Sequence, residues 1–121
     1  MIKFKTIFTV LFLFSTSIFV YSSESSPVVK DPEYLDELIV KLAWEPVPGA
    51  SLYNIYRTND NLTSKYAVTN LNEFIDPELQ RDKVYIYQIS AVIEQSETSL
   101  SENLEVSTKF GPRGVFDIQP S

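Results

Sequence analysis

Hydrophobic and polar residues alternate in several short stretches of the chain. The clearest alternation covers residues 38 to 45, where every second position is apolar, namely Leu38, Val40, Leu42 and Trp44. A period of two residues is that of a β-strand with one buried face. Pro46 cannot donate a ladder hydrogen bond, and the dipeptide Pro48-Gly49 is typical of a turn, so we expect this strand to end there.

Six further segments have strand-like patterns: residues 28–29, 53–57, 65–69, 73–76, 84–94 and 104–108. In the second of them Tyr53 and Ile55 share the buried face, and Tyr56 lies on the outer face. The segment 84–94 is the longest, and both of its faces carry apolar residues, which is typical of a strand in the middle of a sheet. No helical period occurs after residue 23, so the pattern predicts an all-β chain.

The positions on the buried faces form the predicted core. Burial of each large apolar side chain contributes roughly 1.5–3 kcal/mol, so that a dozen of them provide a reasonable core for a sandwich without disulfides. The predicted core residues are Leu38, Val40, Leu42, Trp44, Tyr53, Ile55, Phe74, Leu79, Tyr85, Tyr87, Ile89, Ala91, Leu104 and Val106.

Two motifs in these strands resemble the fibronectin type III family, whose members are immunoglobulin-like β-sandwiches. The first is a strand that ends in Trp44, followed by Glu-Pro-Val-Pro-Gly-Ala and then by Tyr-Asn-Ile-Tyr-Arg at residues 53–57. The second places Leu79 six residues before Tyr85, which is followed by Tyr87, Ile89 and Ala91.

This resemblance covers about residues 37 to 108 and implies a seven-stranded immunoglobulin-like β-sandwich. It also implies that the indole of Trp44 lies between the two sheets. Tyr85 is expected to form a tyrosine corner, in which its hydroxyl bonds to the backbone near Leu79.

The sequence divides into four segments. Residues 1–23 are typical of a secretory signal peptide, because Lys3 and Lys5 precede an apolar run. The run is shorter than the ~20 residues needed to span a bilayer, so we expect cleavage; the alternative is a retained membrane anchor. We expect three segments to follow the signal peptide: a flexible lead-in that can include an edge strand (24–36), the fibronectin type III-like domain (37–109) and a C-terminal tail (110–121).

Composition excludes several kinds of chemistry. The chain has no cysteine and no histidine, so it lacks disulfides, thiol nucleophiles, the usual general base and the commonest zinc ligand. Neither a Gly-rich phosphate loop nor a Gly-x-Ser-x-Gly motif is present. We therefore predict a non-catalytic protein without a cofactor. The net charge of −6 argues against nucleic acid and anionic membrane surfaces as partners.

Two local motifs suggest ligands or modification. Four acidic residues lie close together near the end of the lead-in: Asp31, Glu33, Asp36 and Glu37. Clustered carboxylates suit calcium, but the spacing and the glycine of a calcium loop are absent, so we interpret this cluster as a solvated loop. The sequence Asn61-Leu62-Thr63 matches an N-glycosylation acceptor, which matters only if the source glycosylates such sites.

We expect an exported binding module, secreted or periplasmic, that contacts another protein through loops or an exposed sheet edge and does not contact a membrane once the signal is cleaved. One alternative is an accessory domain that contacts carbohydrate through a row of exposed aromatic residues, for which Tyr56 and Tyr66 are the candidates. Another is a spacer without a ligand. The resemblance does not decide among them, because one fold hosts many functions.

The C-terminal tail carries a small apolar group at Val115, Phe116 and Ile118. The tail can fold back over Tyr56, Ile86 and Val92 on the outer face of a sheet, or it can pair with the edge of a partner's sheet; a frayed end is the third interpretation. The predicted partner-contact residues are therefore Tyr56, Tyr66, Ile86, Phe116 and Ile118.

Overall fold

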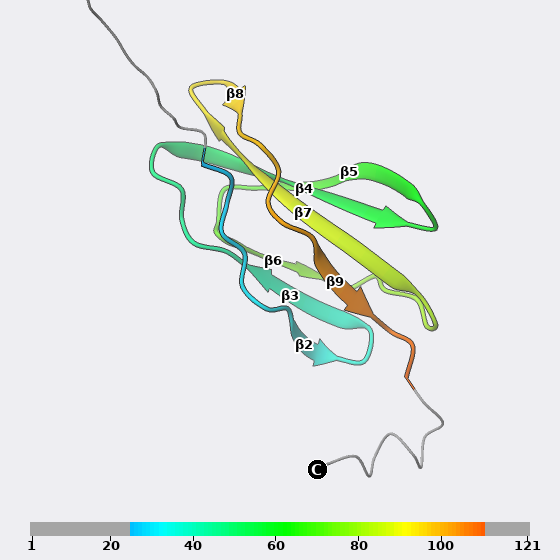
Figure 1. Ribbon diagram of the computed structural model, residues 1–121. Helices are drawn as coiled ribbons and strands as arrows, with labels where there is room; N and C mark the ends of the chain where they lie inside the picture. Colours follow the sequence, from blue (N-terminus) through cyan, green and yellow to red (C-terminus); the bar gives the residue numbers. More distant parts are fainter. Residues whose placement is uncertain (1–24, 111–121) are drawn as a thin grey trace, which may run out of the picture.

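The computed structural model describes residues 25–110, which contain eight β-strands and no helix (Figure 1). The strands are β2 (Glu33–Asp36), β3 (Ile39–Ala43), β4 (Ala50–Asn59), β5 (Leu62–Thr69), β6 (Glu73–Asp76), β7 (Val84–Ile93), β8 (Ser96–Glu97) and β9 (Leu104–Ser107). Within this range nothing helical is long and apolar enough to cross a membrane. The predicted signal peptide, and the tail beyond Phe110, lie outside the described residues.

The strands form two antiparallel sheets that pack face to face (Figure 1), which confirms the predicted all-β sandwich. One sheet has the order β2-β3-β6, and the other has the order β5-β4-β7-β8. Strand β9 also pairs with β7. Strand β4 pairs with one edge of β7, and β8 and β9 pair with different parts of its other edge. The pattern predicted only one strand, residues 104–108, at this edge.

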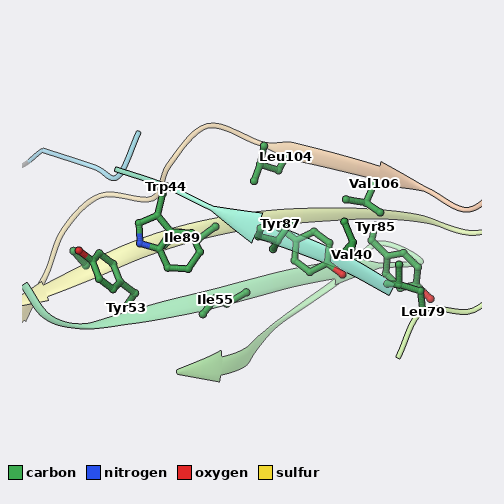
Figure 2. Packing of buried hydrophobic residues seen from close by; sticks show 12 residues of the cluster. Val40, Trp44, Tyr53, Ile55, Leu79, Tyr85, Tyr87, Ile89, Leu104 and Val106 are labelled. Atoms are coloured by element: carbon green, nitrogen blue, oxygen red, sulfur yellow. The ribbon is translucent and has the colours of Figure 1, made fainter. Parts of the chain in front are cut away.

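The core between the sheets consists of twelve buried residues, and all twelve were predicted (Figure 2). The other two predicted members, Leu38 and Phe74, are partly buried and pack against this cluster. Trp44 is completely buried, and its indole meets the ring of Tyr53 edge-on, with ring centroids 5.3 Å apart. The Tyr53 hydroxyl accepts a hydrogen bond of 2.8 Å from the backbone N–H of Val47, which ties the turn after Trp44 to the core.

The lead-in contributes one strand, β2, to the first sheet and one isolated bridge beside it. At the predicted edge strand, residues 28–29, the structure has a single isolated bridge between Val29 and Trp44. Strand β2 pairs with the other end of β3, so Glu33 and Asp36 lie in a strand and not in the predicted loop, although both are exposed to solvent as predicted. All four residues of β2 are exposed, so this strand has no buried face that an alternating pattern could reveal.

A tyrosine from β2 closes one open side of the sandwich. The hydroxyl of Tyr34 accepts a hydrogen bond of 3.0 Å from the backbone N–H of Ser107 and donates one of 2.9 Å to its carbonyl oxygen. Ser107 belongs to β9 in the opposite sheet. The Tyr34 hydroxyl thus bonds to both the N–H and the carbonyl oxygen of one β9 residue, as the backbone of a paired strand does. The edges of the two sheets are thereby joined through neutral hydrogen bonds.

Two hairpins have loops of two residues in which both residues have positive φ. The values are 53° and 65° at Asp60 and Asn61, between β4 and β5, and 49° and 71° at Glu94 and Gln95, between β7 and β8. This is the geometry of a type I′ turn, which matches the twist of the strands. Asp and Asn tolerate the left-handed region and mark the first turn in the sequence, whereas Glu-Gln does not mark the second, and β8 was therefore predicted to be part of a loop.

Side-chain hydroxyls continue the ladder of β7 where the last strand is interrupted. Between β8 and β9 the backbone N–H of Ala91 donates to Thr98 Oγ1 at 3.0 Å, and that of Ile89 donates to Ser101 Oγ at 2.9 Å. Backbone donors at these two positions are thus satisfied without a regular partner strand. The interruption also makes this edge of the sheet irregular, which is one way to prevent edge-to-edge association.

The tyrosine corner is present as predicted. The hydroxyl of Tyr85 accepts a hydrogen bond of 2.8 Å from the backbone N–H of Gln80, the residue after Leu79. Thr108 supports the same loop, because its hydroxyl accepts from the N–H of Lys83 at 3.0 Å. The connection between the two sheets is therefore held from β7 and from the end of β9.

We expect Tyr85→Phe to lower the free energy of unfolding by about 1–3 kcal/mol, because it leaves the N–H of Gln80 without its acceptor. Urea denaturation measures this change. Tyr56→Phe is the matched control and should cost less, because the Tyr56 side chain is only partly buried on the outer face. Equal losses in the two variants would contradict the corner assignment.

We expect Gln95→Gly to raise the free energy of unfolding by up to about 1 kcal/mol, because glycine adopts the positive φ of this position without steric cost. Asn61→Gly, in the equivalent turn, should gain less, because asparagine already tolerates this conformation. Thermal and urea melts of both variants make the comparison. A loss of stability in Gln95→Gly would show that the second turn is unstrained.

Candidate interaction surface

A buried carboxylate joins the two sheets on the side opposite Tyr34. Asp76, the last residue of β6, has no solvent exposure and receives hydrogen bonds from three side chains of the other sheet. Its Oδ2 accepts from Arg57 Nη1 at 2.8 Å and from the Tyr87 hydroxyl at 2.5 Å. Its Oδ1 accepts from the Tyr66 hydroxyl and from the backbone N–H of Glu78, both at 2.9 Å. Each oxygen thus has two donors.

The charges of this cluster stabilise one another. Burial alone would raise the pKa of the Asp76 carboxyl, but the hydrogen bonds from Tyr87, the backbone of Glu78, Tyr66 and Arg57 outweigh burial and hold that pKa below its usual range. Burial, and then the bond to Asp76, raises the pKa of Tyr66 to about 12. The same two causes raise the pKa of Tyr87.

Arg57 also contacts aromatic rings. Its guanidinium carbon lies 3.7 Å from the centroid of the Tyr66 ring and 5.1 Å from that of Tyr85. Such cation–π contacts add to the attraction from the carboxylate. Burial works against the charged guanidinium, but the hydrogen bond and charge of Asp76 raise the pKa of Arg57 overall.

The geometry of this cluster is that of a structural cross-link. A carboxylate with a lowered pKa and four donors has no free acceptor position for a substrate or a metal ion. The role of Asp76 was not predicted, although the sequence carries one signal of it. Arg57 has the same phase in β4 as Tyr53 and Ile55, and an arginine that points inward needs a buried counter-ion.

A second cluster lies on the outer face of the sheet β5-β4-β7-β8. Glu97 of β8 reaches across β7 to β4, and its Oε2 accepts from the Tyr56 hydroxyl at 2.6 Å and from Asn54 Nδ2 at 3.1 Å. The same oxygen accepts a short hydrogen bond from the Ser90 hydroxyl. Its other oxygen, Oε1, accepts no hydrogen bond from any residue between 25 and 110.

The donors of this cluster are held rigidly. Asn54 is only 5% exposed and Ser90 is fully buried, although both point away from the core. Hydrogen bonds from Ser90 and then from Tyr56 lower the pKa of Glu97, and the charge of Lys65 contributes. The hydrogen bond to Glu97 raises the pKa of Tyr56. Glu97 is therefore ionised at neutral pH and fixed in position.

Apolar side chains surround this carboxylate. Leu52 is 40% exposed and pairs with Val92, and Val68 is 51% exposed and pairs with Asn54, so all of them share the outer face. We call Leu52, Tyr56, Val68 and Val92 the outer-face patch. Exposed apolar side chains that gather on one face beside a rigid polar group make this face the candidate interaction surface.

The structure separates the predicted contact residues. Tyr56 belongs to the outer-face patch, whereas Tyr66 points to the Asp76 cluster, where its ring contacts the Arg57 guanidinium and is nearly perpendicular to the ring of Phe74. Ile86 lies farther along the outer face, in an open hollow of about 390 Å³ whose lining includes the ion pair of Lys83 and Asp60. The two tyrosines therefore do not form the planar aromatic row that the carbohydrate alternative required. Phe116 and Ile118 lie outside the described residues.

The surface of the described residues is strongly acidic. Residues 25–110 contain fourteen Asp and Glu and seven Lys and Arg, and five ion pairs each join one of each kind. Nine carboxylates and two ammonium groups, those of Lys65 and Lys109, therefore remain outside ion pairs in this range. Among the same residues, no group of three or more acidic side chains is placed to hold a metal ion.

Comparison with known proteins gives matches in structure only. No family model matches the sequence, and no curated protein sequence matches it either. An Fn3-like protein from Clostridium thermocellum is 25% identical with a TM-score of 0.60, and the match covers 69% of this chain and 92% of that one. The FN5 domain of Drosophila Lar is 25% identical with a TM-score of 0.59, covering 74% and 100%. A β-1,2-glucanase from Parabacteroides distasonis is 24% identical with a TM-score of 0.62, and the match covers 71% of this chain but only 13% of the glucanase.

We expect Asp76→Asn to lower the free energy of unfolding at pH 7 by about 3–5 kcal/mol, because it leaves the charge of Arg57, whose side chain is only 18% exposed, without its partner. The folded-state pKa of Asp76 is depressed, so its contribution is present above the unfolded pKa of about 3.9 and is lost as pH falls toward the folded value. Denaturation at several pH values should thus show that the free energy of unfolding falls less steeply in acid for Asp76→Asn than for the wild type. Asp82→Asn, which changes an exposed residue, is the control and should show the same dependence of stability on pH as the wild type. An equally weakened dependence in this control would contradict the assignment of the effect to Asp76.

Proposed function

Because the chain has the fold of fibronectin type III domains, we propose that it is an exported, non-catalytic module that binds another protein. Domains of this kind are commonly extracellular and typically non-catalytic. The signal-like sequence of residues 1–23 supports export. The absence of cysteine and histidine from the chain fits a binding role, because the usual nucleophile and general base are missing.

One observation carries the proposal, namely the outer-face patch with Glu97 at its centre. Leu52 and Val68 keep apolar area in solvent, and the neighbouring carboxylate is held by three donors. The other polar cluster, around Asp76, uses all of its acceptors internally and supports stability rather than binding. Clustered apolar exposure beside a rigid polar group favours recognition of a protein.

A second candidate is an accessory domain that contacts carbohydrate, and the similarity to a small part of a glucanase motivates it. At 24% identity this similarity concerns the fold alone. The separate orientations of Tyr56 and Tyr66 weaken this candidate, because a sugar platform needs aromatic rings that share one face.

The test is affinity capture from the extracytoplasmic fraction with the tagged full chain, followed by reconstitution with the purified captured protein. We expect one protein to bind the folded chain and not the variant Trp44→Asp, which buries an unpaired charge and disrupts the core. Retardation in a gel containing soluble β-glucan, without a protein partner, would favour the carbohydrate candidate instead.

The intact mass of the exported chain should correspond to an N-terminus near Ser23.

A further inference from the structure

We propose that Glu97 and the outer-face patch receive a basic segment of the partner protein in which an arginine lies between apolar side chains. This inference rests on the proposed protein-binding function and specifies the surface and the chemistry of the partner. Its support comes from the position of Glu97, its unused oxygen, the apolar surround and the overall charge.

The position of Glu97 does not depend on a ligand. Its Oε2 receives three hydrogen bonds, from Asn54 and Tyr56 on β4 and from Ser90 on β7. Asn54 and Ser90 are buried, so they hold the carboxylate in one place. A group that is already fixed loses little conformational entropy when a partner binds, which favours affinity.

The other oxygen of Glu97 is available to the partner. Oε1 has no donor among the residues that the structure describes, although a carboxylate oxygen has two acceptor positions. A guanidinium group suits this position because it forms charge-assisted hydrogen bonds and is less strongly hydrated than an ammonium group. The partly buried Tyr56, whose hydroxyl bonds to the same carboxylate, lies beside this position and adds an aromatic contact for the guanidinium.

The apolar members of the patch strengthen the attraction between Glu97 and the arginine of the partner. Leu52 and Val68 are about half exposed, and Val92 lies beside Leu52 in the sheet. Apolar contacts around a central charged pair exclude water, which strengthens the pair. The partner segment therefore needs apolar side chains on both sides of its arginine.

The charge of the described residues selects a basic partner over a second copy of the chain. Nine carboxylates remain outside ion pairs against two ammonium groups, so two copies repel each other, whereas a basic segment is attracted. Lys65 is the exception on this face, because it pairs with Tyr56 across β4 and β5 and forms no ion pair. Its positive charge opposes a bound arginine, so removal of this charge should improve binding.

The test uses a library of random 12-residue peptides displayed on phage and selected on the immobilised full chain. We expect the recovered peptides to be enriched in arginine next to apolar residues. A synthetic peptide with the consensus sequence should bind Glu97→Gln about tenfold or more weakly, because a charge-assisted hydrogen bond is lost. The same peptide should bind Lys65→Gln more tightly, a gain that a purely structural role of these residues would not produce.

Glu73→Gln is the matched control, because it removes one exposed, unpaired carboxylate from the opposite sheet, and it should bind like the wild type. Val68→Thr provides a second variant outside the hydrogen-bonded cluster, in case Glu97→Gln fails to fold, and should weaken binding several-fold. Melting temperatures identify any variant that is misfolded.

In the peptide experiments, the proposal is overturned by no enrichment of arginine, by equal affinity for wild type and a folded Glu97→Gln, or by equal losses in Glu97→Gln and Glu73→Gln. Self-association of the wild type in analytical ultracentrifugation, abolished by Val68→Thr, would identify a second copy as the occupant instead. If the captured natural partner binds Glu97→Gln as it binds the wild type, the surface is wrong while the protein-binding function stands. If nothing is captured at all, the function itself fails.

Discussion

The buried carboxylate of Asp76 is the interaction on which the arrangement of the two sheets depends. Taking an ionised carboxylate out of water is costly, and the cost is offset only when charge and hydrogen bonds surround it completely. Here the donors come from β4, β5 and β7, while Asp76 itself belongs to β6. Only one relative placement of the sheets satisfies all of them together, so the cluster contributes specificity as well as stability.

The outer face of the second sheet is organised like an interior layer. Asn54 and Ser90 are as inaccessible as core residues, although they point away from the core. Buried polar groups need hydrogen-bond partners, and the side chain of Glu97, delivered by the short strand β8, supplies them. The interrupted last strand therefore has a role, because it brings a carboxylate to a face that a regular strand would leave uncovered.

The sequence predicts the core well and the polar clusters poorly. Period-two alternation is strong where one face is buried, so Val40, Leu42 and Trp44 could be placed from local pattern alone. Strand β2 has no buried face, and the turn before β8 lacks the residues that mark a type I′ turn, so neither was expected. Of the binding surface, the outer orientations of Tyr56 and Val92 were predicted, but the role of Glu97 was not. Asp76 and Glu97 find their partners over long sequence separations, and a carboxylate without visible partners is ordinarily interpreted as solvated.

The two open sides of the sandwich are closed by different chemistry. On one side a charged carboxylate binds donors from three strands, and on the other the neutral hydroxyl of Tyr34 bonds to the backbone of Ser107. Protonation in acid weakens the first closure and leaves the second intact. In acid, the two sheets should therefore separate first at the side where β5 faces β6, while the contact between β2 and β9 still holds them together.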